Sequence, residues 1–195
     1  PAGYRFPVYA AYISYHIGDM TQKELRDKLG YVPQKGVLFS GTIDSNIRYG
    51  KPEITDAQVK EAAEVAQATE FIDTKPEKYE SPVSQGGTNV SGGQKQRLSI
   101  ARAIAKDPEI FIFDDSFSAL DFKTDSQLRK ALKEYTKDAT TVIVAQRIST
   151  ILGADQIIVL DDGHMAGIGT HKELMANCEV YQQIARSQLS EEELA

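Results

Sequence analysis

Short apolar runs alternate with helix-forming segments along most of this 195-residue chain. The runs hold five or six residues, which suits a strand buried in a sheet and is too short for a buried helix. They lie at residues 109–113, 140–145 and 155–160. Strands that alternate with helices in this way indicate an α/β fold with a mainly parallel sheet.

The helices between these runs are predicted from their start signals and their periodicity. They are expected at residues 55–69, 91–106 and 124–136, with a short one after Thr170. In a capping box, a Ser or Thr and a Gln or Glu three residues later bond each other's backbone amides. Such pairs stand at Thr55–Gln58, Ser91–Gln94 and Thr170–Glu173.

The composition bounds the class of protein. Hydrophobic residues make up 41% of the chain and charged residues 26%, which is typical of a soluble single domain. Twenty-two basic residues stand against 28 acidic ones, and this balance argues against a protein that binds nucleic acid through phosphates. Cys178 is the only cysteine, so an internal disulfide and a cysteine-based metal cluster are excluded.

The first 18 residues differ from the rest of the chain. They carry one charged side chain, Arg5, and four of the nine tyrosines. They lack the basic start, apolar centre and small-residue cleavage pattern of a signal peptide. Their aromatic and β-branched content favours a strand, and a foreign leader or a cloning boundary is the alternative interpretation.

Two of the apolar runs end in a pair of acids. Asp161 and Asp162 are followed by Gly163, and this pattern indicates a hairpin turn. Asp114 and Asp115 instead lead into a helix. Ligands bind beyond the carboxyl ends of strands in open α/β sheets. Asp114 and Asp115 are therefore candidates for holding Mg²⁺ and orienting a water.

The segment Ser91-Gly92-Gly93-Gln94 opens a predicted helix. A helix N-terminus with two glycines leaves its first amides accessible, and such an end attracts phosphate. The alternative is an ordinary capping box with loop glycines. The order of a glycine-rich helix start, an apolar strand and an acid pair favours the phosphate site.

These segments, taken in order, resemble the nucleotide-binding domain of ABC transporters. The stretch from Asn89 to Arg97 is similar to the signature motif of that family, and residues 31–34 and 38–50 resemble the Q-loop region of its exporters. Residues 111–115 resemble the Walker B strand, residues 118–121 the D-loop, and residues 144–150 the switch loop. The resemblance covers roughly residues 19–185.

The resemblance implies a RecA-like P-loop NTPase core with an inserted helical subdomain. We expect one domain over residues 1–195, N-terminally truncated or altered. Its expected parts are an atypical leader at 1–18, the core at 19–40 and 91–195, and the helical subdomain at 41–90.

The resemblance also implies a role for individual residues, with ATP and Mg²⁺ as cofactors. Asp114 would hold Mg²⁺, and Gln34 would contact Mg²⁺ and the attacking water. The residues expected to contact ATP held by the opposite domain of a head-to-tail dimer, or to bridge its two sites, are Ser91, Gly92, Gly93, Gln94 and Asp121. The residues expected at the catalytic step are Asp115, Gln146 and Gln34.

Two of these positions depart from the family pattern. Asp115 stands where the family has Glu, and its carboxylate is one methylene shorter. Gln146 stands where the family has His, and an amide cannot carry a proton or a positive charge. The pattern resembles the degenerate half of a heterodimeric multidrug-type exporter, which implies that this chain's own site hydrolyses ATP weakly while its signature motif serves the partner.

A third departure concerns the Walker A motif, the P-loop G-x-x-x-x-G-K-[ST], which no segment matches. The nearest candidate, residues 36–42, has Thr42 where Lys is needed. Without the N-terminal strand and the P-loop helix, the sheet lacks a central element. We therefore expect an exposed apolar surface there, which either associates with another copy or is covered by residues 4–17. The missing motif leaves open a non-hydrolysing fragment that donates its signature or regulates a partner.

The resemblance further implies partners and a location. They are a second nucleotide-binding domain and the coupling helices of a transmembrane domain, with no nucleic acid. The fragment itself is expected to be soluble and to work at the cytoplasmic face of the cell membrane. A DNA-maintenance ATPase of the same superfamily would need long coiled coils, and the sequence has no heptad run. An importer subunit is the remaining alternative, although residues 41–50 look like exporters.

Overall fold

The structure is a computed structural model that describes residues 19–190. Its described elements fall into two compact units, which are divided between Val142 and Ile143. Residues 4–17, which are one of the two alternatives for covering the expected apolar surface, lie outside the described residues. Within residues 19–190, no helix is long and apolar enough to cross a membrane.

The sheet of the first unit is built on a parallel strand pair. β1 (Leu29–Val32) runs beside β4 (Ile110–Asp114), and β5 (Thr140–Val144) follows, giving the order β1-β4-β5. The two phenylalanines of β4 are buried and stack on each other. The predicted strand at 109–113 and its place in a parallel sheet are confirmed.

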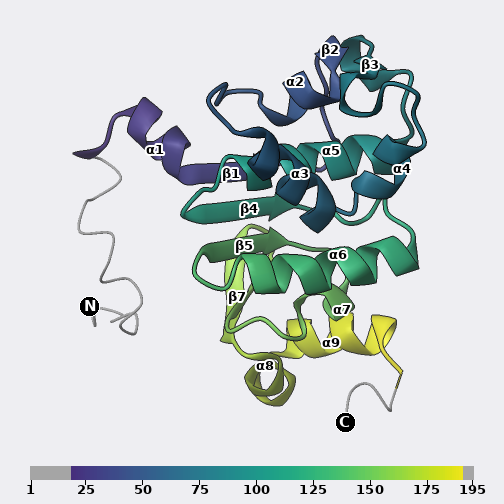
Figure 1. Cartoon of the computed structure of the whole chain (residues 1–195). Helices are drawn as coiled ribbons and strands as arrows, with labels where there is room; N and C mark the ends of the chain where they lie inside the picture. Colours follow the sequence, from purple (N-terminus) through teal and green to yellow (C-terminus); the bar gives the residue numbers. More distant parts are fainter. Residues whose placement is uncertain (1–18, 191–195) are drawn as a thin grey trace. The chain divides into compact units, whose positions relative to one another are not determined.

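Helix α5 (Gly92–Ala105) is the central helix of the first unit. It packs against β1 and against α2 (Ile43–Ile47) and α3 (Asp56–Val65), as Figure 1 shows. Eight of its residues are buried. The predicted capping box is present, because the Ser91 side chain accepts from the Gln94 amide and Gln94 returns the bond.

The remaining elements of this unit are short apart from one helix. Helix α6 (Phe122–Tyr135) packs against α3. The short elements are α1 (Gln22–Lys28), β2 (Gly41–Thr42), α4 (Thr69–Asp73), the 3₁₀ turns η3 (Lys78–Glu80) and η4 (Gln85–Gly87), and β3 (Pro82–Val83). Strands β2 and β3 pair antiparallel.

Two predicted helix boundaries are wrong. The helix predicted over 55–69 ends at Val65, because Gln67 takes a left-handed backbone conformation (φ 56°) and breaks the helical path. The helix predicted from residue 124 begins at Phe122, because the Asp121 side chain caps it by accepting from the Thr124 amide.

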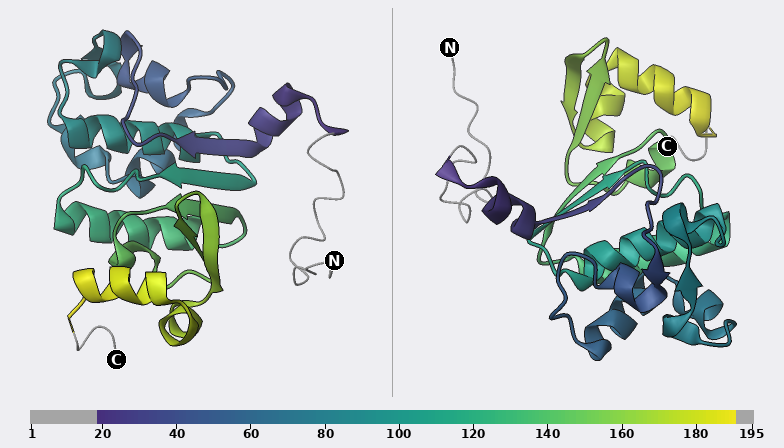
Figure 2. Two further views of the ribbon diagram at one scale, coloured as in Figure 1. Left: turned by 180° about the vertical axis from the view of Figure 1, so that it is seen from behind. Right: turned by 90° about the horizontal axis from the view of Figure 1, so that it is seen from above.

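The second unit is a hairpin covered by helices (Figure 2). Strands β6 (Ile157–Asp161) and β7 (His164–Gly169) pair antiparallel through a turn at Asp162 and Gly163, which confirms the predicted hairpin. The helices are α7 (Ile148–Ile151), α8 (His171–Asn177) and α9 (Glu179–Gln188).

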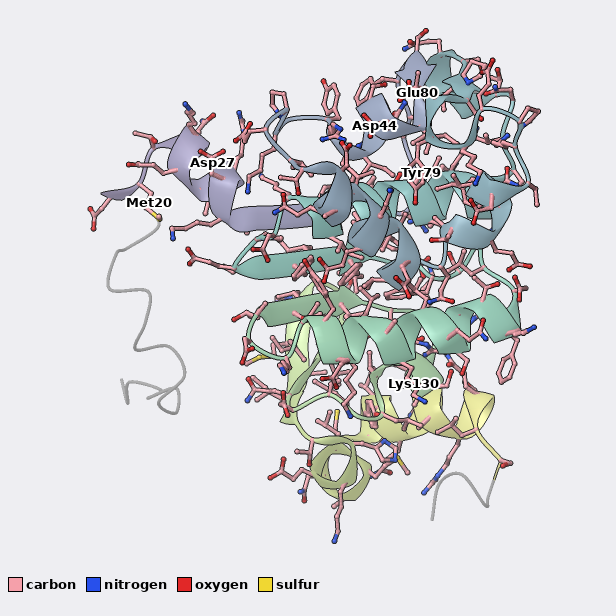
Figure 3. The ribbon with its side chains drawn as sticks, viewed as in Figure 1. Met20, Asp27, Asp44, Tyr79, Glu80 and Lys130 are labelled. Atoms are coloured by element: carbon pink, nitrogen blue, oxygen red, sulfur yellow. The ribbon has the colours of Figure 1, made fainter. Side chains whose placement is uncertain are left out.

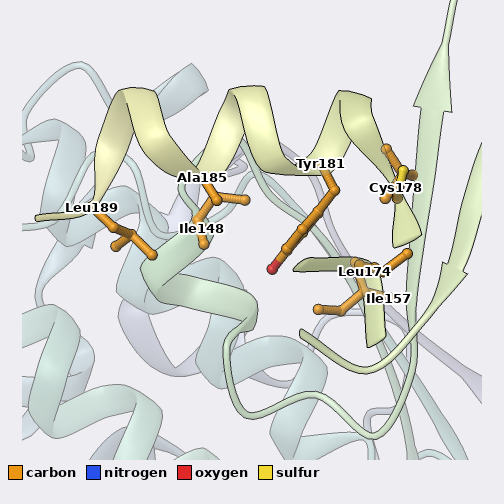
Figure 4. Packing of buried hydrophobic residues seen from close by; sticks show 8 residues of the cluster. Ile148, Ile157, Leu174, Cys178, Tyr181, Ala185 and Leu189 are labelled. Carbon is orange, nitrogen blue, oxygen red and sulfur yellow. The ribbon is translucent and has the colours of Figure 1, made fainter. Parts of the chain in front are cut away.

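The core of the second unit gathers around Tyr181, which is 1% exposed. Figure 4 shows its ring pointing from α9 into the cluster. The other members are Ile148, Ile157, Val159, Leu174, Cys178, Ala185 and Leu189. The Tyr181 hydroxyl and the His171 ring hydrogen-bond at 2.8 Å. This unit therefore has a hydrophobic core of its own.

The prediction that the last two strands are buried is wrong. In β5, Val142 and Val144 are exposed, because the described residues leave the faces of this strand largely uncovered. In β6 burial alternates, because one face packs into the cluster around Tyr181 while Ile158 and Leu160 stay exposed on the other.

Candidate functional site

The acid pair stands at the carboxyl end of β4. Asp114 is the last residue of the strand, and Asp115 follows in a left-handed backbone conformation with φ 43°. Asp tolerates this conformation better than most residues, and a backbone held there is typical of functional sites. The Asp115 carbonyl accepts a hydrogen bond from the Ser118 hydroxyl at 3.0 Å, which fixes the turn.

Parallel pairing brings a second segment to the same edge. Because β1 runs in register with β4, the residues that follow Val32 lie beside those that follow Phe113. Gln34 Nε2 donates to Asp115 Oδ2 at 3.0 Å, and the Tyr31 hydroxyl donates to Asp114 Oδ2 at 3.1 Å. The structure thus brings together three of the predicted site residues.

A buried serine ties the two strand ends together. Ser116 is fully buried, and its hydroxyl donates to the Val32 carbonyl at 2.8 Å. The bond spans the gap between β1 and β4 just where the chain leaves both strands. It therefore fixes the segments that carry Gln34, Asp114 and Asp115 relative to each other.

The start of α5 is open to solvent. Ser91 and Gly92 are exposed, and a side chain added at Gly92 would meet nothing within 4 Å. Gly92 and Gly93 occupy the first two helical positions, where the backbone amides have no acceptor within the helix. A side chain at Gly93 would come within 3.5 Å of the Ala119 carbonyl, so the segment before Asp121 lies beside this helix start.

Two predicted ligand residues act as caps in this structure. The Gln94 side chain accepts from the Ser91 amide at 3.1 Å. Asp121 Oδ1 accepts from the Thr124 amide at 3.0 Å, and this bond lowers the pKa of the Asp121 carboxyl. The predicted roles of Gln94 and Asp121 toward a nucleotide stay predictions.

Gln146 belongs to the second unit, and nothing places it against the acid pair. Its backbone carbonyl accepts from Gln188 Nε2 at 2.9 Å, and Gln188 Oε1 accepts from the Ile148 amide at 2.8 Å. These bonds anchor the start of α7 to the end of α9. The predicted catalytic role of Gln146 is untested.

Sequence reasoning missed Gln96, a buried residue of α5 that is 1% exposed. Its Oε1 accepts from the Gly36 amide at 2.9 Å, and its Nε2 donates to the Pro33 carbonyl at 3.0 Å. One side chain thus holds both ends of the loop that carries Gln34. A polar residue on the buried face of an amphipathic helix is the signal that could have revealed it.

The acid pair can serve as part of a metal site. Residues 19–190 hold no group of three or more His, Cys, Asp or Glu that could bind a metal by itself. Mg²⁺ is commonly bound by one or two carboxylates, with waters and phosphates completing its shell. Asp114 and Asp115 therefore fit an Mg²⁺ ion whose remaining ligands are waters or phosphate oxygens.

A separate cavity of about 440 Å³ lies in the helical part of the first unit. None of the predicted site residues lines it. Figure 3 labels three of its lining residues, Asp44 on α2 and Tyr79 and Glu80 on η3. Arg48 lies at the same cavity and pairs with Asp44 at 2.7 Å.

Comparison with known proteins decides the family. Residues 10–118 match the ABC transporter family, a range that covers more than half of the chain. This chain belongs to the ABC transporter family. The resemblance stated from the signature, Q-loop and Walker B segments is confirmed.

Relatives of this family member include proteins named for ATP binding and for multidrug export. A protein of Mycobacterium tuberculosis named as an uncharacterized ABC transporter ATP-binding protein is 46% identical over 169 residues, 85% of this chain and 29% of that protein. A Staphylococcus aureus protein named for multidrug export as an ATP-binding/permease protein is 45% identical over 87% of this chain and 29% of its own length. The chain therefore spans less than a third of these relatives.

A solved structure shares the fold. A bacterial Atm1-family ABC exporter with ATP bound superposes with a TM-score of 0.85 at 39% identity, covering 90% of this chain and 31% of that one. The expected RecA-like α/β fold with a parallel sheet is confirmed.

Proposed function

We propose that this ABC family member is the ATP-binding part of an exporter. Its own catalytic site is weakened, and its signature motif serves ATP held by a partner domain. The observation that carries the proposal is the meeting of Gln34 with Asp114 and Asp115 at one edge of the sheet. Carboxylates suit Mg²⁺, and a neighbouring amide suits the orientation of a water.

The start of α5 supports the signature role. The amides of Gly92 and Gly93 point out of the helix end and are joined there by the Ser91 hydroxyl, which keeps a proton to donate. The helix dipole adds a partial positive charge at the same place. These groups would bind the terminal phosphate of an ATP molecule that the opposite domain of a head-to-tail dimer holds.

The acid pair supports a weak catalytic site. Asp114 would hold Mg²⁺ and Gln34 would orient water, while Asp115 would accept a proton from that water. The Asp115 carboxylate is short and already accepts from Gln34 Nε2. Bound Mg²⁺ would supply the positive charge that offsets charge building on the phosphate oxygens. With Gln146 in place of a switch histidine, slow turnover follows.

The partners follow from the exporter relatives. A second nucleotide-binding domain would complete both ATP sites, and a heterodimer would place a competent site next to this weakened one. Residues 41–90 would face the coupling helices of a transmembrane domain. The chain would then act at the cytoplasmic face of the membrane, with ATP and Mg²⁺ as cofactors.

The test is Asp115→Glu in the assembled heterodimer. Glu would extend the carboxylate by one methylene toward the attacking water, and general-base catalysis typically contributes 10²–10⁴-fold, so we expect turnover at this site to rise by about tenfold or more. The matched control is Asp162→Glu, because Asp162 is also the second acid after a strand and has φ 45°. Equal turnover in both variants would contradict the weakened-site proposal.

Ser91→Ala tests the signature role in the same heterodimer. Turnover at the partner's competent site should fall, because its ATP would lose the Ser91 hydroxyl. Unaltered turnover at that site would overturn the assignment of Ser91.

A second function is a non-hydrolysing fragment that donates its signature or regulates a partner. It is favoured by the absence of any P-loop pattern in the 195-residue sequence. Titration of the isolated chain with a fluorescent ATP analogue and Mg²⁺ separates the two functions. Binding with ordinary affinity excludes the second function, and no binding excludes independent ATP capture by this chain.

A further inference from the structure

Tyr31 is a strand residue whose side chain does not enter the core. Its neighbours Gly30 and Val32 are buried, whereas Tyr31 is 55% exposed. Burial therefore does not explain an aromatic residue at this position. What the side chain does make is a hydrogen bond from its hydroxyl to Asp114 Oδ2 at 3.1 Å.

The strand register explains how the two side chains meet. Tyr31 lies opposite Ile112 in the parallel pair, so both point to the same face of the sheet. Asp114 is two residues beyond Ile112 and points to that face as well. A tyrosine is long enough to reach this diagonal neighbour, so the contact is built into the register of β1 and β4.

Three other described tyrosines make different contacts. Tyr135 donates to the Ile104 carbonyl, and Tyr181 bonds the His171 ring. Tyr49 has the same 55% exposure as Tyr31, but its ring stacks on Phe39 at 4.1 Å. Among the hydrogen bonds that the structure shows over residues 19–190, Tyr31 supplies the phenol that meets a carboxylate.

We propose that Tyr31 is a positioning residue for Asp114. Its hydroxyl fixes one carboxylate oxygen, Oδ2, and leaves Oδ1 to face a divalent cation or its water. Ser116 holds the backbone beneath the pair, so the strand fixes the position of Asp114 and Tyr31 fixes its rotamer. The inference rests on the proposed role of Asp114 as a holder of Mg²⁺.

The physical reason is preorganisation. A free carboxylate at a strand end rotates, and binding a cation must then restrict it. Groups that hydrogen-bond to a ligating carboxylate remove that freedom before the metal arrives, and losing such a group commonly costs 10–100-fold in affinity. Because Tyr31 is exposed, we expect an effect near the lower end of this range.

The experiment measures Mn²⁺ binding to the full chain by electron paramagnetic resonance, with Mn²⁺ alone as the probe. Asp114→Asn identifies the part of the binding that depends on Asp114. Tyr31→Phe keeps the ring and removes the hydroxyl, and we expect the dissociation constant of that part to rise about tenfold. Tyr49→Phe removes the hydroxyl of a tyrosine residue of equal exposure and should leave the constant unchanged.

The outcomes separate the inference from the proposed function. Asp114-dependent binding that is equal in Tyr31→Phe and the unchanged chain overturns the role of Tyr31 alone. Binding that does not depend on Asp114, or no binding, overturns both.

A double variant and thermal unfolding guard against a purely structural effect. Tyr31→Phe combined with Asp114→Asn should bind as weakly as Asp114→Asn alone. If the thermal midpoint of Tyr31→Phe equals that of Tyr49→Phe while its Mn²⁺ affinity is lower, the result supports positioning. A fall in both midpoint and affinity, with no recovery of affinity in Tyr31→His, overturns it.

Discussion

At the scale of single residues, the site depends on side chains that hold others in place. Tyr31 and Gln34 each donate to one acid of the pair, and Ser116 closes the strand ends beneath them. Asp115 adds a left-handed backbone conformation, which Asp adopts more readily than Glu. Asp115, which stands where the family has the longer Glu, therefore also suits the backbone of this turn.

Asp121 offers a test by pH. Its pKa is lowered in the folded chain, chiefly by the hydrogen bond from the Thr124 amide. The stabilisation from this cap is fully present above the ordinary carboxyl pKa of about 4 and is lost as the pH falls through the lowered value. Asn caps a helix without titrating, so Asp121→Asn should resist acidification better.

The measurement is the free energy of unfolding of both chains in urea at pH 6 and pH 3. The unchanged chain should lose more stability between the two values than Asp121→Asn does. Parallel losses would show that the Asp121 cap does not titrate in this range.

At the scale of elements, α5 has polar side chains on the face that packs against the rest of the unit. Gln96 binds the loop at Pro33 and Gly36, and Arg102 binds the Asn46 and Val37 carbonyls at 2.7 and 2.9 Å. Burial lowers the pKa of Arg102 to about 10. The helix is thus joined to its neighbours by hydrogen bonds as well as by apolar contact.

Gln96→Leu should destabilise the chain. The substitution keeps the volume but leaves the Gly36 amide and the Pro33 carbonyl unpaired, at about 1–3 kcal/mol for each unpaired group. Urea unfolding measures the loss. Gln183→Leu on α9 is the control, because Gln183 is exposed and surface substitutions usually change stability by less than about 0.5 kcal/mol. Equal stabilities would show that the Gln96 bonds contribute nothing.

The success of the sequence analysis depended on the range of each interaction. The capping boxes at Thr55, Ser91 and Thr170 were predicted because both partners lie within one helical turn. The bonds of Gln96 join residues about 60 positions apart, so the helix pattern can mark Gln96 as a buried polar residue but cannot name its partners. The exposure of β5 was missed for the same reason, since burial depends on which elements cover a strand.

The candidate site shows the same division. The acid pair and the glycines at the start of α5 were found because each lies within a few residues. Gln34 and Asp115 are 81 positions apart, and their contact depends on the pairing of β1 with β4. Only the structure could therefore reveal it. Tyr31 carried no signal, because a tyrosine in a strand is ordinary until its partner is known.

At the scale of the molecule, apolar side chains remain at the surface of the second unit. The outer face of the β6–β7 hairpin carries Ile158 opposite Ile168 and Leu160 opposite Met165, and all are at least 40% exposed. A contiguous apolar patch of this kind is typical of an interaction surface. The apolar surface expected from the missing P-loop strand and helix belongs to the parallel sheet instead, and it stays a prediction.

Leu160→Lys with Met165→Lys tests whether this face drives association. Two charges on the patch would oppose burial against another copy, so the chain should shift toward its monomer mass. Light scattering coupled to size-exclusion chromatography measures the mass. Ile184→Lys is the control, because Ile184 is exposed and lies on α9 rather than on a hairpin strand. A monomeric unchanged chain would contradict association through this face.

The loop of Gln34 has a mechanical consequence. Gln96 grips the chain at Pro33 and again at Gly36, so only Gln34 and Lys35 lie between two anchors on one helix. A tether this short transmits displacement almost without slack. If α5 tilts when a phosphate reaches its first turn, the Gln34 amide moves with the helix. The distance between Gln34 Nε2 and Asp115 Oδ2 then changes with the tilt.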